Sequence, residues 1–336
     1  MIVLLAVVVA ILSWLGTAGV RRYALAHHLM DHPNERSSHT APTPRGGGAA
    51  IAGAMFVGLL GGYGCGWLGG AQLLGYLGAG TMVALLGFLD DHGHVAARWR
   101  LLGHFIAASW LMYWLGGLPV LELGGGRWDL GVWGWPLGVV GLVWLLNLYN
   151  FMDGIDGIAG SQAVSVCGVA CVIYLVGGHG SLLLAPLCMA GAAAGFLGWN
   201  WPPARIFMGD VGSGFVGLMI GGMALQAGHE VPGYLWVWAI LMAVFICDAT
   251  WTLLRRLLRG EKVYQAHRSH GYQHAAAKSG SHLKVVLGVV GINLAWLSVC
   301  AYVGTAHREY GFALLVAYIP ILVIAYGLRA GDIDSA

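Results

Sequence analysis

The chain has 336 residues, of which 58% are apolar and 10% charged, and its formal net charge is +2. A soluble domain typically has about 25% charged residues, so too few charges are present here to cover a soluble globular surface. Intrinsic disorder is also excluded, because it needs low hydrophobicity and high net charge. The composition therefore predicts a polytopic membrane protein.

Eleven apolar segments are long enough to cross a bilayer as helices of about 20 residues each. Arg21 and Arg22 follow the first segment and no basic residues precede it, which favours a retained helix over a cleaved signal peptide. The predicted fold class is an all-α, polytopic integral membrane helix bundle of about 11 transmembrane helices. The expected spans are residues 2–20, 47–68, 71–89, 101–117, 132–149, 158–177, 181–199, 211–228, 233–254, 285–304 and 311–328.

The basic residues predict how this bundle is oriented. Alternate loops and the tail after residue 328 together contain 15 of the 17 Lys and Arg residues, and only Arg127 and Arg308 lie in the remaining loops. The positive-inside rule places the basic loops and the C-terminus in the cytoplasm and the N-terminus outside. The basic loops are 21–46, 90–100, 150–157, 200–210 and 255–284.

Glycine accounts for 55 residues, more than twice its average share of about 7%. Small residues four positions apart let transmembrane helices approach closely, as at Gly191 and Gly195 or Gly217 and Gly221. We interpret most of the glycines as helix-packing residues. Contacts within one chain or between the chains of a homodimer both fit this pattern.

Five aspartates lie at the predicted cytoplasmic ends of the spans: Asp90, Asp91, Asp153, Asp156 and Asp210. Two carboxylates about 5 Å apart repel each other by roughly 3 kcal/mol at an effective dielectric of 20, so several together favour a bound cation. Carboxylates without thiolates suit a hard ion such as Mg²⁺. A single aspartate of this kind is equally explained as a solvated helix end, but the set is not. The sequence therefore predicts a magnesium–phosphate site.

The spacing of these residues suggests separate tasks. Asn150, Asp153 and Asp156 are three residues apart, so on a helical turn they would share one face. Asp90 and Asp91 are adjacent and cannot point in one direction. One of the pair is expected to approach the metal while the other meets a different substrate group.

Two further features have alternative interpretations. The Gly46–Gly48 run after Arg45 is either a phosphate-binding nest or a flexible entry to the second span. Asp248 lies inside the ninth span, where a carboxylate is a functional candidate by default but could equally be a structural partner for a neighbouring polar group.

Taken in chain order, the motifs resemble those of the bacterial glycosyltransferase 4 family, the polyprenyl-phosphate N-acetylhexosamine-1-phosphate transferases. The resemblance covers residues 31–275, most of the chain. The motifs are Arg36-Ser-Ser-His39, Pro42-Thr-Pro-Arg-Gly-Gly-Gly48, Asp90-Asp91, Asn147-x-x-Asn150-x-x-Asp153-Gly-Ile-Asp156-Gly, Gly209-Asp210-x-Gly-Ser213 and His267-Arg-Ser-His270.

The resemblance implies an Mg²⁺-dependent transferase, with Mn²⁺ as a substitute ion. Such an enzyme moves N-acetylhexosamine-1-phosphate from a UDP-sugar to undecaprenyl phosphate and releases UMP. The implied metal ligands are Asp210 and Asp91, and the implied catalytic residues are Asp90, Asp91 and Asp156. The implied substrate-binding residues are Asn150, Asp153, Arg45, His267, Arg268 and His270.

The resemblance also implies the setting of the reaction. We expect one membrane-embedded domain, residues 1–336, in the bacterial cytoplasmic (inner) membrane. The lipid bilayer is an expected partner, and nucleic acid is not. Its active site is expected on the cytoplasmic face, in loops 21–46, 90–100, 147–157, 200–214 and 255–284.

The late loop bears on the sugar. His267-Arg-Ser-His270 is typical of transferases that start O-antigen, lipopolysaccharide or capsular chains, and the sugar would be GlcNAc or a 6-deoxy-N-acetylhexosamine such as QuiNAc or FucNAc. The alternatives are the peptidoglycan-precursor member of the same family and a transporter of a polyprenyl-linked or anionic solute. A purely structural scaffold gives no reason for five clustered aspartates.

Overall fold

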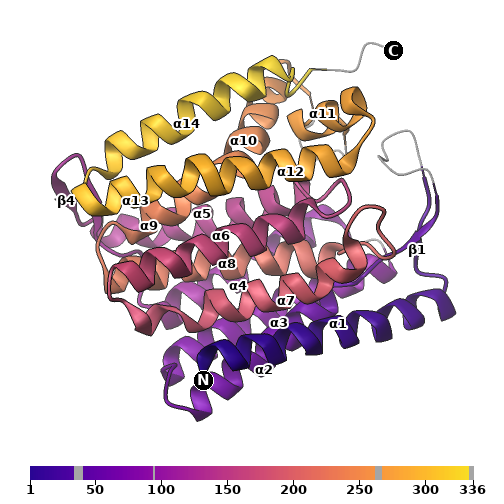
Figure 1. The fold of residues 1–336 in the computed structure, drawn as a ribbon, viewed down its shortest axis with the longest axis horizontal. Coiled ribbons are helices and arrows are strands. Elements are labelled where there is room, and N and C mark those ends of the chain that lie inside the picture. Colours follow the sequence, from indigo (N-terminus) through magenta and orange to yellow (C-terminus); the bar gives the residue numbers. More distant parts are fainter. Residues whose placement is uncertain (34–40, 94, 262–266, 333–336) are drawn as a thin grey trace.

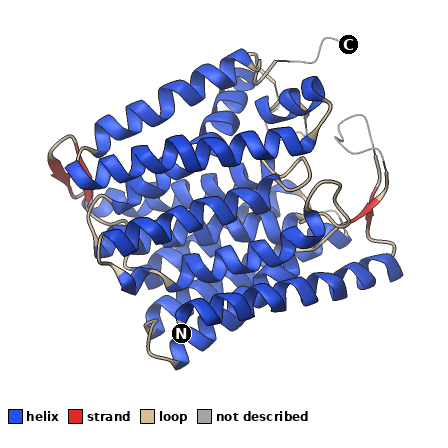
Figure 2. Ribbon diagram, in the orientation of Figure 1, coloured by secondary structure: helices blue, strands red, loops and turns tan. Residues whose placement is uncertain are grey.

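The computed structural model describes residues 1–33, 41–93, 95–261 and 267–332, and it is a bundle of helices whose long axes run side by side (Figure 1). Two antiparallel pairs of very short strands, β1 with β2 and β3 with β4, are the strands of this part of the chain (Figure 2). The helices are α1 (Ile2–Ala26), α2 (Gly48–Gly64), α3 (Gly70–His92), α4 (Ala97–Leu115), α5 (Gly134–Phe151), α6 (Ile158–Val176), α7 (Leu184–Asn200), α8 (Asp210–Glu230), α9 (Tyr234–Leu241), α10 (Ala243–Leu258), α11 (Gly271–Ser279), α12 (His282–Ile292), α13 (Ser298–His307) and α14 (Tyr310–Gly327). The strands are β1 (Met30–Asp31), β2 (Thr43–Pro44), β3 (Leu121–Leu123) and β4 (Gly126–Trp128).

Each of the eleven expected spans coincides with a helix or with a pair of consecutive helices. Within the described residues, eight helical segments are long and apolar enough to cross a membrane. A ninth is the pair α9 and α10, which is bent by 67° at Met242, and α2 is shorter than the others. The all-α polytopic membrane fold is therefore confirmed, whereas the count of eleven and the orientation stay predictions. Helices suit this composition because lipid offers backbone N–H and C=O groups no partners outside the chain.

Helix α8 lies at the centre of the bundle and is buried along nearly its whole length. Its small residues make this possible, because a Cβ on Gly217 would lie 2.9 Å from the Cα of Leu146 in α5. Likewise, a Cβ on Gly195 in α7 would lie 2.1 Å from the carbonyl oxygen of Ala10 in α1. Both Gly-x-x-x-Gly steps therefore pack helices of one chain, and the homodimer stays a prediction.

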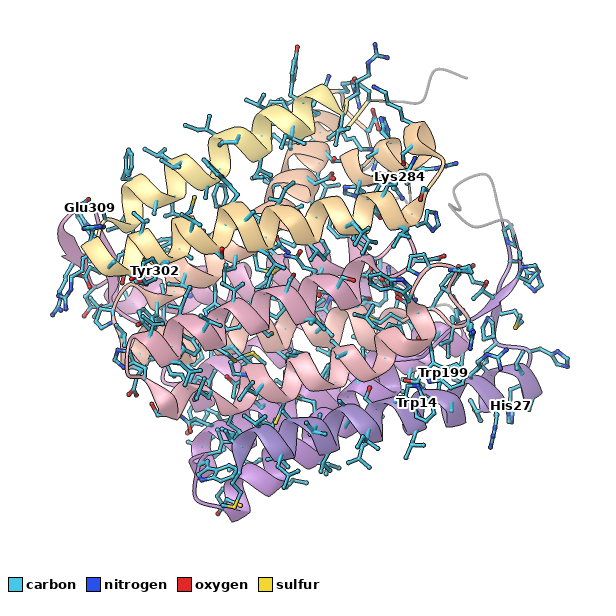
Figure 3. All side chains as sticks on the ribbon, viewed as in Figure 1. Trp14, His27, Trp199, Lys284, Tyr302 and Glu309 are labelled. Carbon is cyan, nitrogen blue, oxygen red and sulfur yellow. The ribbon has the colours of Figure 1, made fainter. Side chains whose placement is uncertain are left out.

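The two ends of the bundle carry different features. The β3–β4 hairpin and Glu309 lie at one end, whereas His27, Lys284, α11 and strand β1 lie at the other (Figures 1 and 3). Between the ends, α1 packs on α7, where the indole Nε1 of Trp199 donates to the carbonyl of Trp14 at 3.0 Å (Figure 3). The ends of α3 and α5 and the beginning of α8 all lie at the His27 end, which we call the site end.

Candidate active site

The site end is organised around the first turn of α8. The carboxylate of Asp91, at the end of α3, accepts hydrogen bonds from the backbone N–H groups of Asp210 (3.2 Å) and Val211 (3.3 Å). These are free donors at a helix N-terminus, where a carboxylate also interacts favourably with the helix dipole. Gly87 allows the approach, because a Cβ there would lie 2.4 Å from the backbone nitrogen of Val211. Asp91 is therefore buried as the cap of α8.

The neighbouring aspartate faces a different group. Nη1 of Arg100 donates both to Asp90 and to Oδ2 of Asp210, the latter at 3.1 Å. Asp90 also accepts from the backbone N–H of Val95 at 2.8 Å. As expected from their adjacency, Asp90 and Asp91 have different partners. Asp90 and Asp210 converge on one cationic nitrogen, although they come from α3 and α8.

Asn150 completes this group from the last turn of α5. Its Nδ2 donates to Oδ1 of Asp210 at 2.8 Å and to Oγ of Ser213 at 2.7 Å. A narrow cleft opens beside these side chains, and its polar lining includes His104, a residue that the motif analysis did not single out. The full lining is Val83, Leu86, Gly87, Asp90, Arg100, His104, Leu146, Asn147, Asn150, Phe151, Asp210 and Gly214.

The turn after α5 differs from the sequence prediction. Because α5 ends at Phe151, Asp153 and Asp156 lie in an irregular turn, and the expectation that they share a helical face is wrong. Oδ2 of Asp156 accepts from the backbone N–H of Ala204 at 3.1 Å and lies 3.3 Å from Nδ1 of His282. Asp156 thus joins this turn to the segment before α8 and to the start of α12.

Asp153 is the site aspartate in the least favourable surroundings for a negative charge. Among the described residues no hydrogen bond to its carboxylate is recorded. Burial, together with the nearby charges of Asp210, Asp91 and Asp156, raises the pKa of Asp153 well above its usual value. Such a carboxyl group can accept hydrogen bonds from a polar substrate and, when it is protonated, donate one to it.

The Gly46–Gly48 run does not form a phosphate nest in this structure. Instead, the N–H groups of Gly47 and Gly48 donate to the carbonyls of Phe207 and Met208 at 2.9 and 2.8 Å. Gly48 is needed for packing, because its Cβ would lie 2.1 Å from the Cα of Gly212 in α8. The run is therefore an entry to α2 that packs against the beginning of α8.

Arg45 is tied to the same centre. Its Nη2 donates to the carbonyl of Asp91 at 2.6 Å, and its Nε lies 3.8 Å from Oδ1 of the same residue. The Arg36-Ser-Ser-His39 motif precedes it in the chain and lies outside the described residues.

The late loop lies at the site end, next to α5. The ring of His270 stacks near Phe151, with a centroid distance of 6.4 Å, and the ring of His267 lies 4.8 Å from that of His270. Burial, followed by the neighbouring His270 and Arg256, lowers the pKa of His267 to about 3. His267 is therefore neutral at physiological pH. Arg268, between the two histidines, is partly exposed, so a dissolved anion can reach it.

The donor chemistry at the site suits a hard divalent ion. Among the described residues, no three His, Cys, Asp or Glu side chains are arranged as a closed metal site. Mg²⁺ needs no such set, because it typically takes one or two carboxylates and completes its shell with water and substrate phosphates. The guanidinium nitrogen of Arg100 already places positive charge where Asp90 and Asp210 meet. The residues present therefore fit Mg²⁺, with Asp90 and Asp210 as the carboxylates that converge.

Comparison with known proteins identifies the family. Residues 73–228, which run from the first turn of α3 to the last turn of α8, match the model of glycosyl transferase family 4. A probable undecaprenyl-phosphate N-acetylglucosaminyl 1-phosphate transferase of Bacillus subtilis is 29% identical over 276 residues, covering 80% of this chain and 75% of the relative.

Two other relatives are similar over most of their length. A decaprenyl-phosphate N-acetylglucosaminephosphotransferase of Mycolicibacterium smegmatis is 26% identical, covering 94% of this chain and 86% of the relative. A phospho-N-acetylmuramoyl-pentapeptide-transferase of Thermodesulfovibrio yellowstonii is 27% identical, covering 83% of this chain and 85% of the relative. The family match includes the convergent aspartates of α3 and α8, and the chain belongs to glycosyl transferase family 4, as a multi-span membrane transferase.

Proposed function

We propose that this protein transfers N-acetylhexosamine-1-phosphate from a UDP-sugar to undecaprenyl phosphate and releases UMP. The observation that carries the proposal is the convergence of Asp90 and Asp210 on one cationic nitrogen at the end of a membrane bundle. Such a centre can hold a metal ion and phosphates at the depth of lipid headgroups. The relatives named for polyprenyl-phosphate transfer support the same reaction class.

Asp90 and Asp210 are the residues that would hold Mg²⁺, and Mn²⁺ would substitute for it. When bound, the ion would neutralise phosphate oxygens and stabilise the charge that develops on them during transfer. Asp91 is also an expected metal ligand, and its two oxygens accept from the backbone N–H groups of the first turn of α8. Asp90 instead shares Nη1 of Arg100 with the side chain of Asp210, and this shared contact supports Asp90 as the partner of Asp210.

The proposed reaction is a phosphoryl transfer with a simple balance of bonds. An oxygen of the lipid phosphate attacks the β-phosphorus of the UDP-sugar, and a new P–O–P bond forms. The bond between the β-phosphorus and the bridging oxygen breaks, and UMP leaves with the electron pair. The second pKa of a phosphate monoester is about 6, so the lipid phosphate is largely a dianion and needs no protein base.

Positioning and charge stabilisation contribute most to such a step. We assign Asn150 and Asp153 to the nucleotide sugar, because Asn150 lines the cleft and Asp153 lies three residues later, in the turn that follows α5. Arg45 and Arg100 would offset phosphate charge, and Arg268 would do so from the late loop. Asp156 is held by Ala204 and His282, which supports a role in fixing the turn that carries Asp153.

An apolar cleft between α5, α8 and the bent pair α9–α10 can receive the isoprenoid chain. Its lining is almost entirely apolar and includes Leu145 and Leu148, close to the end of α5 that carries Asn150. A lipid whose chain lies in this cleft would have its phosphate near the site end. We place this end on the cytoplasmic side, because 15 of the 17 basic residues belong to the loops predicted there.

The finer assignment concerns the sugar and the product. We propose GlcNAc or a 6-deoxy-N-acetylhexosamine such as QuiNAc or FucNAc, for a lipid-linked glycan of the O-antigen type. The late-loop sequence His267-Arg-Ser-His270 supports this choice. The similarity to a phospho-N-acetylmuramoyl-pentapeptide-transferase keeps the peptidoglycan-precursor reaction as the second candidate.

The test uses purified protein in nanodiscs with undecaprenyl phosphate, Mg²⁺ and a panel of UDP-sugars, and it measures UMP release. We expect release with one UDP-N-acetylhexosamine, and loss of release with EDTA or in Asp210→Asn. The matched control is Asp129→Asn, a change at the opposite end of the bundle. Release only with UDP-N-acetylmuramoyl-pentapeptide would establish the second candidate. No release with any donor, combined with solute flux in vesicles, would establish a transporter instead.

A further inference from the structure

Asp248 is a buried carboxylate of α10 that the proposed chemistry does not use. Its residue is 7% exposed, and it lies in a segment that belongs to the bent span α9–α10. A carboxylate at such a position is expensive, so it needs strong partners. The structure provides them from a segment more than twenty residues further along the chain.

The partners of Asp248 are the first residues of α11. Oδ1 accepts from the backbone N–H of Gly271 at 2.9 Å, and Oδ2 accepts from that of Tyr272 at 2.8 Å. Oδ1 also lies 3.2 Å from Nδ1 of His270 and 3.3 Å from Oγ1 of Thr252. Both carboxylate oxygens are thus engaged, and most of the bonds go to the segment that directly follows Arg268.

Helix α11 is tied to α5 as well. The hydroxyl of Tyr272 donates to the carbonyl of Phe151 at 2.9 Å. A Cβ on Gly154 would lie 2.2 Å from the same hydroxyl, so α11 and the turn after α5 are in close contact. The first turn of α11 therefore connects Asp248 to the segment that carries Asn150 and Asp153.

We propose that Asp248 is a positioning residue for the nucleotide sugar. By holding the first turn of α11, it keeps Arg268 and its flanking histidines beside the end of α5, which carries Asn150, and the following turn, which carries Asp153. Asp248 touches no substrate itself, because both its oxygens are occupied by the protein. The proposal rests on the proposed transferase function, and it assigns a role to the intramembrane carboxylate that the sequence alone left open.

The first test is a kinetic comparison of Asp248→Asn with the control Asp129→Asn. Asn has nearly the same shape but is neutral and has only one acceptor oxygen, so one of the two backbone N–H groups loses its acceptor and the other keeps only an uncharged one. Asp129 is a matched control, because its carboxylate also accepts from a backbone N–H, that of Gly131 at 2.8 Å, far from the site end. Because the loop that carries Arg268 loses part of its support, we expect KM for the UDP-sugar to rise about 10-fold, which corresponds to about 1.4 kcal/mol.

The pattern of the change distinguishes positioning from a purely structural role. We expect KM for undecaprenyl phosphate and the activation by Mg²⁺ to stay close to wild type. Equal rises in both KM values, or a fall in the amount of active protein with unchanged KM values, would overturn the proposal. A milder variant, Tyr272→Phe, removes only the bond to Phe151 and should raise the same KM by a smaller factor. It keeps the proposal testable if Asp248→Asn does not fold.

A second readout needs no activity. Amide hydrogen exchange in wild type and Asp248→Asn should differ mainly in the peptide that contains Gly271 and Tyr272, where exchange becomes faster. Unchanged exchange there would overturn the proposal even if catalysis falls. If wild-type protein releases UMP from no donor, the proposed function fails, whereas this measurement still decides whether Asp248 holds α11.

A double-mutant cycle completes the test. Arg268→Ala should lower kcat/KM strongly when it is made in the wild-type protein. The same substitution should lower kcat/KM little further in Asp248→Asn, because the loop is already displaced there. With Asp129→Asn as the background, the effect of Arg268→Ala should be the same as in wild type. Additive effects of Asp248→Asn and Arg268→Ala would contradict action through the loop.

Discussion

The carboxylate of Asp91 accepts a hydrogen bond from the backbone N–H of Asp210, with Oδ1 and N 3.2 Å apart. This bond connects the end of α3 to the beginning of α8, and it gives adjacent aspartates different tasks. Asp91 caps the helix that begins at Asp210, whereas Asp90 and the side chain of Asp210 both contact Nη1 of Arg100. The proposed reaction centre is therefore built on a helix N-terminus that a buried carboxylate caps.

Substitution of the two adjacent aspartates should give opposite results. Asp91→Asn loses one of the two acceptors that cap α8, and loss of a helix cap typically costs about 0.5–2 kcal/mol, so Tm should fall while the Mg²⁺ half-saturation constant is retained. Asp90→Asn should keep Tm close to wild type and raise that constant strongly. Thermal unfolding in detergent and UMP release against Mg²⁺ concentration measure the two effects. The reverse pattern would make Asp91 the metal ligand.

Mg²⁺ should stabilise the protein, and Arg100 should compete with it. In Arg100→Gln the repulsion between Asp90 and Asp210 loses its neutralising cation, so added Mg²⁺ should raise Tm by more than it does in wild type. In Asp210→Asn the Mg²⁺-induced rise should disappear. Thermal unfolding with EDTA and with saturating Mg²⁺ measures both. An equal rise in Asp210→Asn and wild type would show that the ion binds elsewhere.

Asp153→Asn is expected to stabilise the protein at higher pH while reducing activity. Because burial raises the pKa of Asp153 above its unfolded value, the folded chain retains a proton that the unfolded chain releases. By linkage, stability is highest below the unfolded pKa and falls as pH rises toward the folded pKa. Asn removes this loss, so the Tm difference between variant and wild type should grow as pH rises above about 4, the pKa of Asp in the unfolded chain.

Thermal unfolding at several pH values, paired with UMP release, tests this prediction. Asp129→Asn is again the control, since its carboxylate is exposed and lies at the opposite end. A Tm difference that does not change with pH would mean that Asp153 titrates normally in the folded protein.

Two glycines of α2 provide a matched pair for the packing at the beginning of α8. A Cβ at Gly48 would lie 2.1 Å from the Cα of Gly212, whereas a Cβ at Gly53 meets nothing within 4 Å. Overpacking typically costs about 1–3 kcal/mol, so Gly48→Ala should lower Tm and activity together. Gly53→Ala should leave both near wild type. Equal behaviour of the two variants would show that α2 and α8 can move apart without cost.

The sequence by itself determined the fold class and where the site lies along the chain. Continuous apolar runs of about 20 residues become helices in lipid, because a helix pairs its backbone groups within the segment and barrel strands would be shorter and alternating. Since the aspartate motifs follow alternate spans, they necessarily end on one side of the membrane. The grouping of Asp90, Asp91 and Asp210 could therefore be predicted without a structure, and the family match agrees with it.

Only the tertiary structure decided what each carboxylate does. Because α5 ends at Phe151, Asp153 and Asp156 do not share a helical face with Asn150, and local spacing did not reveal that end. The capping of α8 by Asp91 and of α11 by Asp248 joins residues far apart in the chain, so no spacing rule connects them. A carboxylate becomes a cap or a ligand according to which donors surround it, and those donors are brought to it by packing between helices.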